Sequence, residues 1–344
     1  MVLYNYHRGN IYAIGAPVFR SFLLSKALGA LNLDLNSGKI VFVVNPHSGN
    51  GKTGGEWPRI SRLAKEILGP FETRLTKGPG DATTLTRDCL LAGADIIVCV
   101  GGDGTLNEVI NGFFAADSPI RKGAALGFIP NGTGCDFSRT FPSPLGIKPA
   151  LQSIKNAATQ TIDLGRIRFR NHQGGTTSRY FHNIASFGMG GEVVERVNRT
   201  SKALGPFVTF IWGTLLTLFS YRKKSVTISV DDGNKITKDI FHIAVANGRY
   251  QGGGMLVAPD AVMDDGLFHI TVIGAMILPL VLWRLPKLYN GKIKTIPQVF
   301  VTTGRKVSLS SAGRVLFDID GEQPGILPAE LEIVPAAIEM IVKG

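Results

Sequence analysis

The chain has 344 residues, 44% of them hydrophobic and 18% charged, a composition typical of a globular protein with one large core or two modest ones. Its formal net charge of +11 indicates an anionic partner. Zinc-finger spacing, RNP-type aromatic runs and long Arg/Lys stripes are all missing from the sequence, which argues against nucleic acid and favours a phosphorylated ligand or an acidic membrane surface. Three cysteines without disulfide or CxxC spacing predict a reducing compartment, and we expect a cytoplasmic location.

Residues 1–38 are predicted to be an N-terminal extension. Apolar residues at 19, 23, 27 and 31 predict one amphipathic helix there, which could rest on a membrane, pack on the protein, or reflect an upstream start codon. Arg20 and Lys26 interrupt the apolar run and argue against a secretory signal. A second apolar stretch, residues 204–221, is uncharged and just long enough to span a bilayer, but Pro206 and Gly213 favour a buried or lipid-facing helix.

From residue 39 onward, short apolar strands alternate with helices. Strands are predicted at 40–45, 71–76, 95–100 and 124–129, with helices at 57–68, 81–92 and 106–114. This alternation predicts a Rossmann-like, doubly wound parallel sheet covered on both faces, with ligands at the carboxyl ends of its strands.

The pattern changes after about residue 141. Shorter strands with turn residues between them are predicted at 161–170, 180–187, 225–230, 239–246, 267–273, 306–309 and 315–319, and a helix at 276–289. We therefore expect an α/β domain over residues 39–140, followed by a second, mainly antiparallel β-rich domain over 141–327.

The most informative motif is the run Gly101, Gly102, Asp103, Gly104 and Thr105, between a predicted strand and a helix. Bare amides in a glycine loop at a helix N-terminus predict an anion site. An aspartate within that loop would repel a phosphate unless a divalent cation were close by, so Asp103 indicates Mg²⁺. Thr105 and Glu108 have the spacing of a capping box.

Two further loops follow neighbouring strands: Asn45–Gly49 and the Gly132-containing run from 130 to 137. Gly51-Lys52-Thr53 resembles the end of a P-loop, but Pro46 stands where its first glycine should be, so the run is not a Walker A motif. Three such loops at one sheet edge predict a nucleotide cleft. The histidines show no zinc-ligand spacing, and no GxSxG elbow occurs.

Acidic and glycine-rich turns recur in the second domain, at 247–254, 258–266 and 320–322; each alone is more typical of a hairpin. Together with the earlier loops they form an ordered series: NPHSG, GGDGTLNEV, PNGTGCDF, ANGRYQGGG, APDAVMDDG and DGE. This series resembles the diacylglycerol kinase catalytic-domain family, which includes bacterial lipid kinases, sphingosine kinases and ceramide kinases. The resemblance runs from about residue 39 to the C-terminus.

The resemblance implies a Rossmann-like domain and a β-rich domain, as in NAD kinases and diacylglycerol kinases, with ATP between them and residues 328–344 returning to the first domain. It implies that the nucleotide is held by Asn45, Thr76, Gly101–Asn107, Gly132 and Thr133. Mg²⁺ would be held by Asp265 with the carbonyls of Val262 and Leu267, and Glu322 would be the proton acceptor, with Asp320 beside it. Most members carry Asn at the position of Cys135.

We therefore predict an ATP- and Mg²⁺-dependent kinase that phosphorylates a lipid hydroxyl. A kinase for a soluble acceptor such as NAD, and a catalytically inactive nucleotide- or lipid-sensing module, are the alternatives. Residues 204–221 and 276–289 are candidate walls of the lipid cleft, and Arg222, Lys223, Lys224, Arg284 and Lys287 are candidates for peripheral contact with an anionic membrane. Which lipid is used, and whether the protein is a homodimer, stays open.

Overall fold

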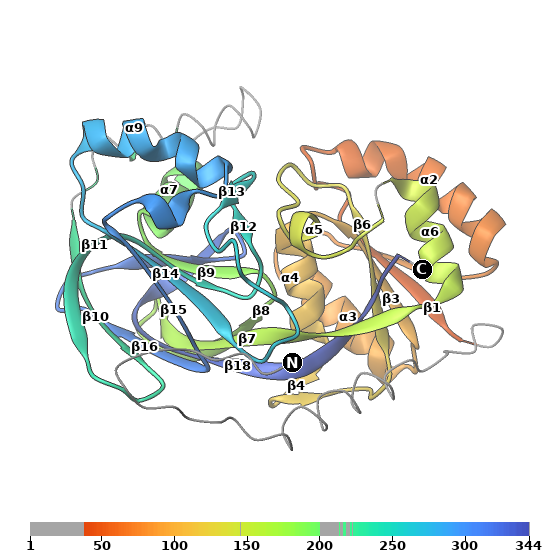
Figure 1. Cartoon of the computed structure of the whole chain (residues 1–344). Coiled ribbons are helices and arrows are strands. Elements are labelled where there is room, and N and C mark those ends of the chain that lie inside the picture. The colour runs from red at the N-terminus through yellow and green to blue at the C-terminus, as the bar shows by residue number, and fades with distance from the viewer. Residues whose placement is uncertain are drawn as a thin grey trace, which may run out of the picture.

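The computed structural model describes residues 38–144, 146–199, 213, 216–217, 221 and 223–343. The predicted N-terminal helix and most of residues 204–221 lie outside this part of the chain. None of the helices within it has the length and apolar character needed to cross a bilayer. Figure 1 shows two parts side by side, an α/β part and a β-rich part.

The α/β part is built on parallel strands in the order β2-β1-β3-β6. These strands are β1 (Ile40–Val44), β2 (Glu72–Leu75), β3 (Ile96–Gly101) and β6 (Ala125–Pro130). The helices are α2 (Lys52–Leu68), α3 (Asp81–Leu91), α4 (Asp103–Gly112), α5 (Phe137–Thr140) and α6 (Ile147–Asn156), and a small hairpin joins β4 (Phe114–Ala115) to β5 (Ser118–Pro119).

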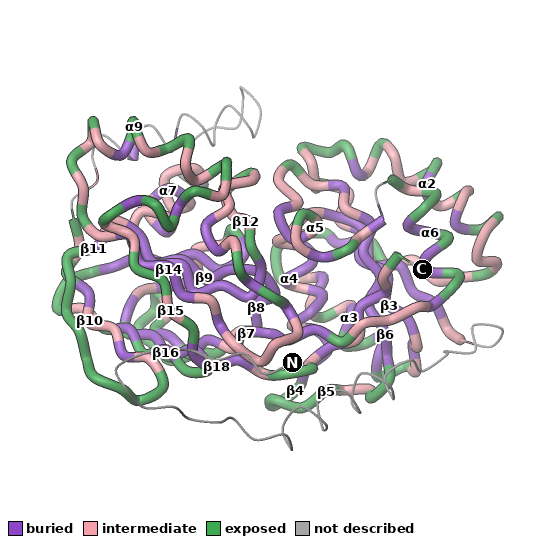
Figure 2. Tube along the Cα trace, in the orientation of Figure 1, coloured by how far each residue is buried: buried purple, intermediate pink, exposed green. Residues whose placement is uncertain are grey.

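Both faces of this sheet are buried, because β1 is apolar at every position. Val41 and Val43 point toward α3 and α4, whereas Phe42 and its neighbours in alternation point toward α2 and α6. Figure 2 shows the strands of this sheet mainly in the colour of buried residues. The predicted doubly wound α/β domain is confirmed.

The β-rich part contains mainly antiparallel strands. They are β7 (Thr159–Asn171), β8 (Thr176–Phe181), β9 (Ile184–Gly188), β10 (Lys224–Val230), β11 (Ile236–Ala246), β12 (Tyr250–Gln251), β13 (Met255–Leu256), β14 (Phe268–Gly274), β15 (Val299–Gly304), β16 (Lys306–Ser310), β17 (Leu316–Ile319) and β18 (Glu322–Ile341). Its helices are α7 (Met189–Arg199), α9 (Leu278–Tyr289) and the 3-10 turn η1 (Ile293–Thr295).

Strand pairing in the β-rich part closes on itself: β11 pairs with β10, which leads through β16, β18, β17 and β9 back to β11. The enclosed space is filled by side chains such as Phe187, Phe317 and Val307. This part therefore has its own hydrophobic core, and the predicted mainly antiparallel β-rich domain is confirmed.

One strand belongs to both parts. Near its start β18 pairs with β17, and at residues 329–332 it pairs with β16. At Glu339 and Met340 it lies parallel to β6 in the sheet of the α/β part, and it pairs with β7 along almost its whole length. The two parts are thus joined by continuous β-structure rather than by a flexible linker.

Candidate active site

The loops after β1, β3 and β6 meet at the carboxyl edge of the parallel sheet. The Asn45 side-chain amide donates to Thr105 Oγ1 at 2.9 Å. The hydroxyls of Ser48 and Thr53 both donate to the carbonyl oxygen of Asn131, at 3.2 and 2.9 Å. The predicted convergence of these three loops is confirmed.

Glycines allow two of these loops to touch backbone to backbone. A Cβ on Gly132 would lie 2.5 Å from the Cα of Gly102, closer than any side chain permits. Gly102 is the N-cap of α4 and supplies no side-chain cap. The first amides of α4 therefore have no side-chain acceptor from the cap residue, an arrangement that suits an anionic ligand.

The predicted capping box at Thr105 and Glu108 is wrong. Helix α4 already begins at Asp103, which places Thr105 inside its first turn. The Glu108 carboxylate instead accepts from the amides of Gly80 and Ala82, at 2.8 and 3.1 Å. Glu108 therefore caps the neighbouring helix α3, whose own N-cap is a glycine.

Asp103 holds the loop that follows β6. Its carboxylate accepts from the backbone amides of Asp136 and Phe137, at 3.0 and 3.4 Å. Burial raises its pKa to about 6, although the positive charge of His182 and the Asp136 amide act in the opposite direction. In this structure the carboxylate is an acceptor at the start of α5, a role that the sequence pattern did not indicate.

The remaining predicted nucleotide residues lie on or near the same edge. The Thr76 amide donates to the Val44 carbonyl at 2.9 Å, just beyond β2, and Thr133 is exposed on the loop after β6. Asn107 is different, because it is fully buried and its side-chain amide donates to Tyr180 O and Asp320 Oδ2. Asn107 therefore links α4 to the β-rich part.

Cys135 follows Gly134 in a left-handed conformation, with φ of 47°. Asparagine tolerates this backbone region better than most residues, which gives a physical reason for the Asn that the resemblance implies at this position. Burial raises the pKa of the Cys135 thiol to about 11. All three cysteines of the chain are free.

Asp320 is surrounded by donors. Its carboxylate accepts from the amides of His182, Asn183 and Ile184 at 3.0–3.1 Å and from Asn107 at 2.7 Å, and the His182 ring lies 2.8 Å away. Burial alone would raise the pKa of Asp320, but the charge of His182 and these hydrogen bonds together lower it. Asp320 is thus held as a carboxylate and positions the turn that carries Glu322.

Glu322 begins β18 after the turn Asp320-Gly321, both of whose residues have positive φ. This turn directs Glu322 to the N-terminal end of α4, where a Cβ on Gly104 would lie 3.2 Å from Glu322 Oε1. Arg179 on β8 pairs with Glu322 at 2.7 Å. Burial raises the pKa of Glu322, and Arg179 partly offsets that rise.

Arg179 and His182 were not predicted as site residues. Arg179 Nε also donates to Asn107 Oδ1 at 2.7 Å, so its guanidinium connects α4 to Glu322. The available signal was the imidazole of His182 within the largely apolar run of residues 180–187, with the cation Arg179 directly before that run.

A second contact joins the parts on the other side of Asp103. The amide of Gly253 donates to Asp136 Oδ2 at 2.7 Å, and the amide of Arg249 donates to Thr140 Oγ1 at 2.9 Å. The glycine run at 252–254 thereby rests against the start of α5. The phosphate-type loops and the second domain's glycine turn form one connected site.

Asp265 lies apart from these loops, on the turn before β14. Its carboxylate accepts from the Leu267 amide at 3.0 Å and lies 3.1 Å from His269 Nε2. Burial, followed by the charges of Asp265 and Asp264, raises the pKa of nearby Asp163. Within the described residues no group of three or more His, Cys, Asp or Glu side chains forms a metal cluster. A cation at Asp265 would have to use carbonyl oxygens as well, as predicted for Val262 and Leu267.

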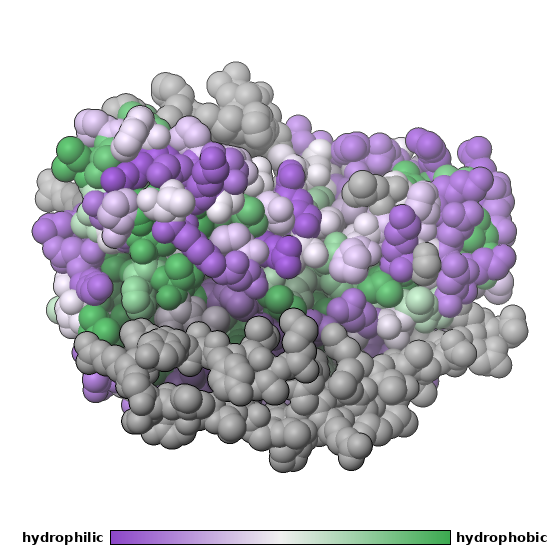
Figure 3. Space-filling model, viewed as in Figure 1, coloured by the Kyte–Doolittle hydropathy of each residue, from purple (hydrophilic) through white to green (hydrophobic). Residues whose placement is uncertain are grey.

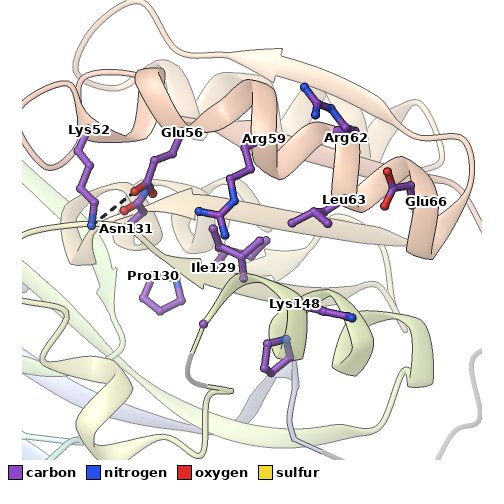
Figure 4. A pocket seen from close by; sticks show the side chains of 13 residues that line it. Lys52, Glu56, Arg59, Arg62, Leu63, Glu66, Ile129, Pro130, Asn131 and Lys148 are labelled. Atoms are coloured by element: carbon purple, nitrogen blue, oxygen red, sulfur yellow. Dashed lines mark hydrogen bonds and ion pairs between the residues drawn. The ribbon is translucent and has the colours of Figure 1, made fainter.

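Behind the loops, a cavity of about 920 Å³ opens between α2 and α6 (Figure 4). Its floor is apolar, at Leu63, Ile129 and Ile147, and basic side chains of Lys52, Arg59, Arg62 and Lys148 surround it. None of the predicted nucleotide residues lines this cavity. It borders the site at Pro130 and Asn131, and the side-chain amide of Asn131 donates to Glu56 at 2.9 Å.

Comparison with known proteins agrees with this geometry. Residues 39–167 match the model of the diacylglycerol kinase catalytic domain, and residues 183–342 match the YegS C-terminal NAD kinase beta sandwich-like domain. The chain is 30% identical over 295 residues to proteins named "Probable lipid kinase YegS-like" from Yersinia pestis (strain Pestoides F) and Yersinia pseudotuberculosis serotype O:1b (strain IP 31758). Each alignment covers 84% of this chain and 94% of the relative.

A solved structure described as a "putative diacylglycerol kinase" from Bacillus anthracis str. Sterne is 26% identical, with a TM-score of 0.70. That match covers 88% of this chain and 97% of the other. The agreement therefore extends through both parts of the fold. The chain belongs to the diacylglycerol kinase catalytic-domain family, among the YegS-like lipid kinases.

Proposed function

We propose that the protein transfers the γ-phosphoryl group of ATP to the hydroxyl of a lipid of the diacylglycerol or sphingoid type. The observation that carries this proposal is the position of Glu322, a half-buried carboxylate with a raised pKa directed at the glycine loop of α4. A carboxylate beside a phosphate-type loop can accept a hydroxyl proton as the new bond forms. The relatives named "Probable lipid kinase YegS-like" support a lipid as the acceptor.

The proposed reaction uses the residues of this chain in separate roles. The amides of the Gly101–Gly104 loop and the N-terminus of α4 bind the phosphates of ATP. Glu322 takes the proton of the lipid hydroxyl while the hydroxyl oxygen bonds to the γ-phosphorus and the bond to the ADP oxygen breaks. Arg179 and Asp320 orient Glu322, and Asp103 keeps the loop after β6 in place.

Mg²⁺ bound with ATP would neutralise phosphate charge. Asp265 lies apart from the phosphate loops and would suit a structural Mg²⁺, because a carboxylate with main-chain carbonyls is an all-oxygen ligand set for a hard cation. The charges of Asp264 and Asp265 already disfavour ionisation of Asp163, which indicates a local excess of negative charge that a cation would relieve. Val262 and Leu267 would supply the carbonyl oxygens.

The test is transfer of label from γ-labelled ATP to diacylglycerol, sphingosine, ceramide, monoacylglycerol, phosphatidylglycerol and NAD in parallel. We expect label in at least one lipid and none in NAD. Label in NAD alone would assign the protein to a soluble acceptor. ATP binding without transfer to any acceptor would favour a sensing module.

A further inference from the structure

Helix α9 exposes an apolar face. Val281 is its only buried residue, and Figure 2 shows the tube of α9 almost entirely in the colours of intermediate and exposed residues. The outward positions follow helical spacing and are occupied by Pro279, Leu282, Trp283, Pro286 and Tyr289. Trp283 is 74% exposed, and Ile277 immediately before the helix is 71% exposed.

This exposure is unusual for a helix of a globular protein. A surface helix normally presents charged and polar residues to solvent, whereas an apolar outer face marks an interaction surface. The helix is also loosely packed against the β-rich part, because a cavity of about 120 Å³ lies between Leu278, Val281 and β11. With Val281 as its single buried residue, α9 is not a core helix.

The chain segment that contains α9 carries charge of one sign. From residue 266 to residue 317 the sequence contains seven Lys and Arg residues and neither Asp nor Glu. Lys287 is in the last turn of α9, and Lys292 and Lys294 follow it. Lys292 is exposed, and Lys294 pairs with Asp260 from outside this segment. Apolar residues bordered by lysines suit the interface of an anionic bilayer.

The position of α9 agrees with such a role. It packs beside β13, where Leu256 approaches Gly291 just after the helix. In Figure 1, α9 lies at the upper edge of the β-rich part, and β12 and β13 lie between it and α5 of the α/β part. The turn between β12 and β13 is the one that contacts α5 across the site.

We propose that α9 docks on an anionic phospholipid bilayer, with Ile277, Leu282, Trp283 and Tyr289 inserted among the lipids and Lys287 and Lys292 at the headgroups. A second copy of the chain is the less suitable occupant, because pairing two such faces would bring two acid-free segments together. The purpose of the docking, delivery of the lipid acceptor, rests on the proposed lipid kinase function. The docking itself does not depend on that function.

The binding test uses the full chain, without ATP, and sedimentation with phosphatidylcholine vesicles or with vesicles that also contain phosphatidylglycerol. We expect binding to the anionic vesicles that falls as salt rises. Ile277→Ser combined with Trp283→Ser should weaken it about ten-fold or more. The matched control is Leu91→Ser on α3, since Leu91 is also 71% exposed but lies in the α/β part.

Charge is tested separately. Lys292→Gln should weaken binding to anionic vesicles about five-fold, the effect expected for one lysine near such a surface, and Lys155→Gln on α6 should not. Equal binding by the α9 variants and their controls would overturn the proposal. So would a shift of the α9 variants from dimer to monomer with unchanged vesicle binding, because α9 would then be an interface between copies.

Turnover distinguishes docking from catalysis. On a short-chain, dispersed lipid acceptor the double α9 variant should match the unmodified protein, and on acceptor embedded in vesicles it should be slower. Absence of activity on every lipid, with vesicle binding intact, would remove the proposed function and leave the docking surface. An equal loss on both kinds of acceptor would contradict docking and place α9 in the catalytic fold.

Discussion

At the scale of single residues, Glu322 carries the sharpest prediction. Glu322→Gln keeps the shape of the side chain and removes its basicity, so kcat should fall by about 10²–10⁴ while ATP binding stays nearly unchanged. The matched control is Glu330→Gln, an exposed position on the same strand. Turnover within a few-fold of the unmodified protein would exclude Glu322 as the base. Asp320 could not replace it, because four hydrogen-bond donors and the His182 ring already surround its carboxylate.

Arg179 should set the pH at which Glu322 works. Burial raises the pKa of Glu322 and the Arg179 charge lowers it, so Arg179→Gln should raise that pKa further. The base is active when ionised, and the acid limb of the kcat/KM profile should therefore move to higher pH. A lower but unshifted profile would mean that Arg179 only supports the fold.

Asp318 predicts a pH dependence of stability. Burial raises its pKa to about 7, despite hydrogen bonds from Ser186 and Gln251. The folded protein holds this proton at pH values where the unfolded chain has already lost it. The contribution of Asp318 to the free energy of unfolding is therefore fully present below about pH 4 and is lost as pH rises through about 7. The melting temperature of Asp318→Asn, measured relative to the unmodified protein, should rise across that range. A constant difference would contradict the raised pKa.

The sequence predicted the roles of site residues where backbone amides form the binding surface, as in the glycine loops. The glycine loops are recognisable because Gly102 and Gly132 must touch. Whether a polar side chain faces the ligand or the second domain depends on contacts distant in sequence. Asn107 was expected at the nucleotide, yet its amide donates to Asp320, 213 positions away. No local pattern encodes that pairing.

At the scale of elements, most predicted strands and helices lie close to elements of the structure, but α6, β15 and the long strand β18 were not predicted. The single strand expected over 180–187 is two strands, β8 and β9, because the intervening residues turn their amides to Asp320. Helix α2 begins at Lys52 rather than 57, since Gly54, Gly55 and Pro58 obscure its first turns in the sequence.

The turn before β14 carries the metal prediction. If Asp265 holds Mg²⁺ with the carbonyls of Val262 and Leu267, added Mg²⁺ should raise the melting temperature of the unmodified protein, and Asp265→Asn should abolish that rise. Asp232→Asn is the control, on the exposed turn between β10 and β11. An equal response to Mg²⁺ in both variants would leave Asp265 as a turn residue that contacts His269.

At the scale of the whole molecule, hydrophilic and hydrophobic residues are distributed unevenly over the surface. Figure 3 shows mostly hydrophilic colour over α2, whereas hydrophobic colour gathers on the β-rich part. The net charge of +11 predicted an anionic partner, but composition alone could not locate it. The location that we propose rests on the exposed face of α9, which only the fold reveals, and on the acid-free segment that contains it, which the sequence already shows.

The sharing of β18 has a consequence for how the protein folds. Every strand that pairs with β18, namely β6, β7, β16 and β17, precedes it in the chain. During synthesis neither sheet can therefore be completed before this strand emerges, and both would be completed by the same event. We expect one cooperative unfolding transition, with amides of β1 and β11 exchanging with deuterium at similar rates. Clearly separate protection of the two parts would show that β18 can leave one sheet while it stays in the other.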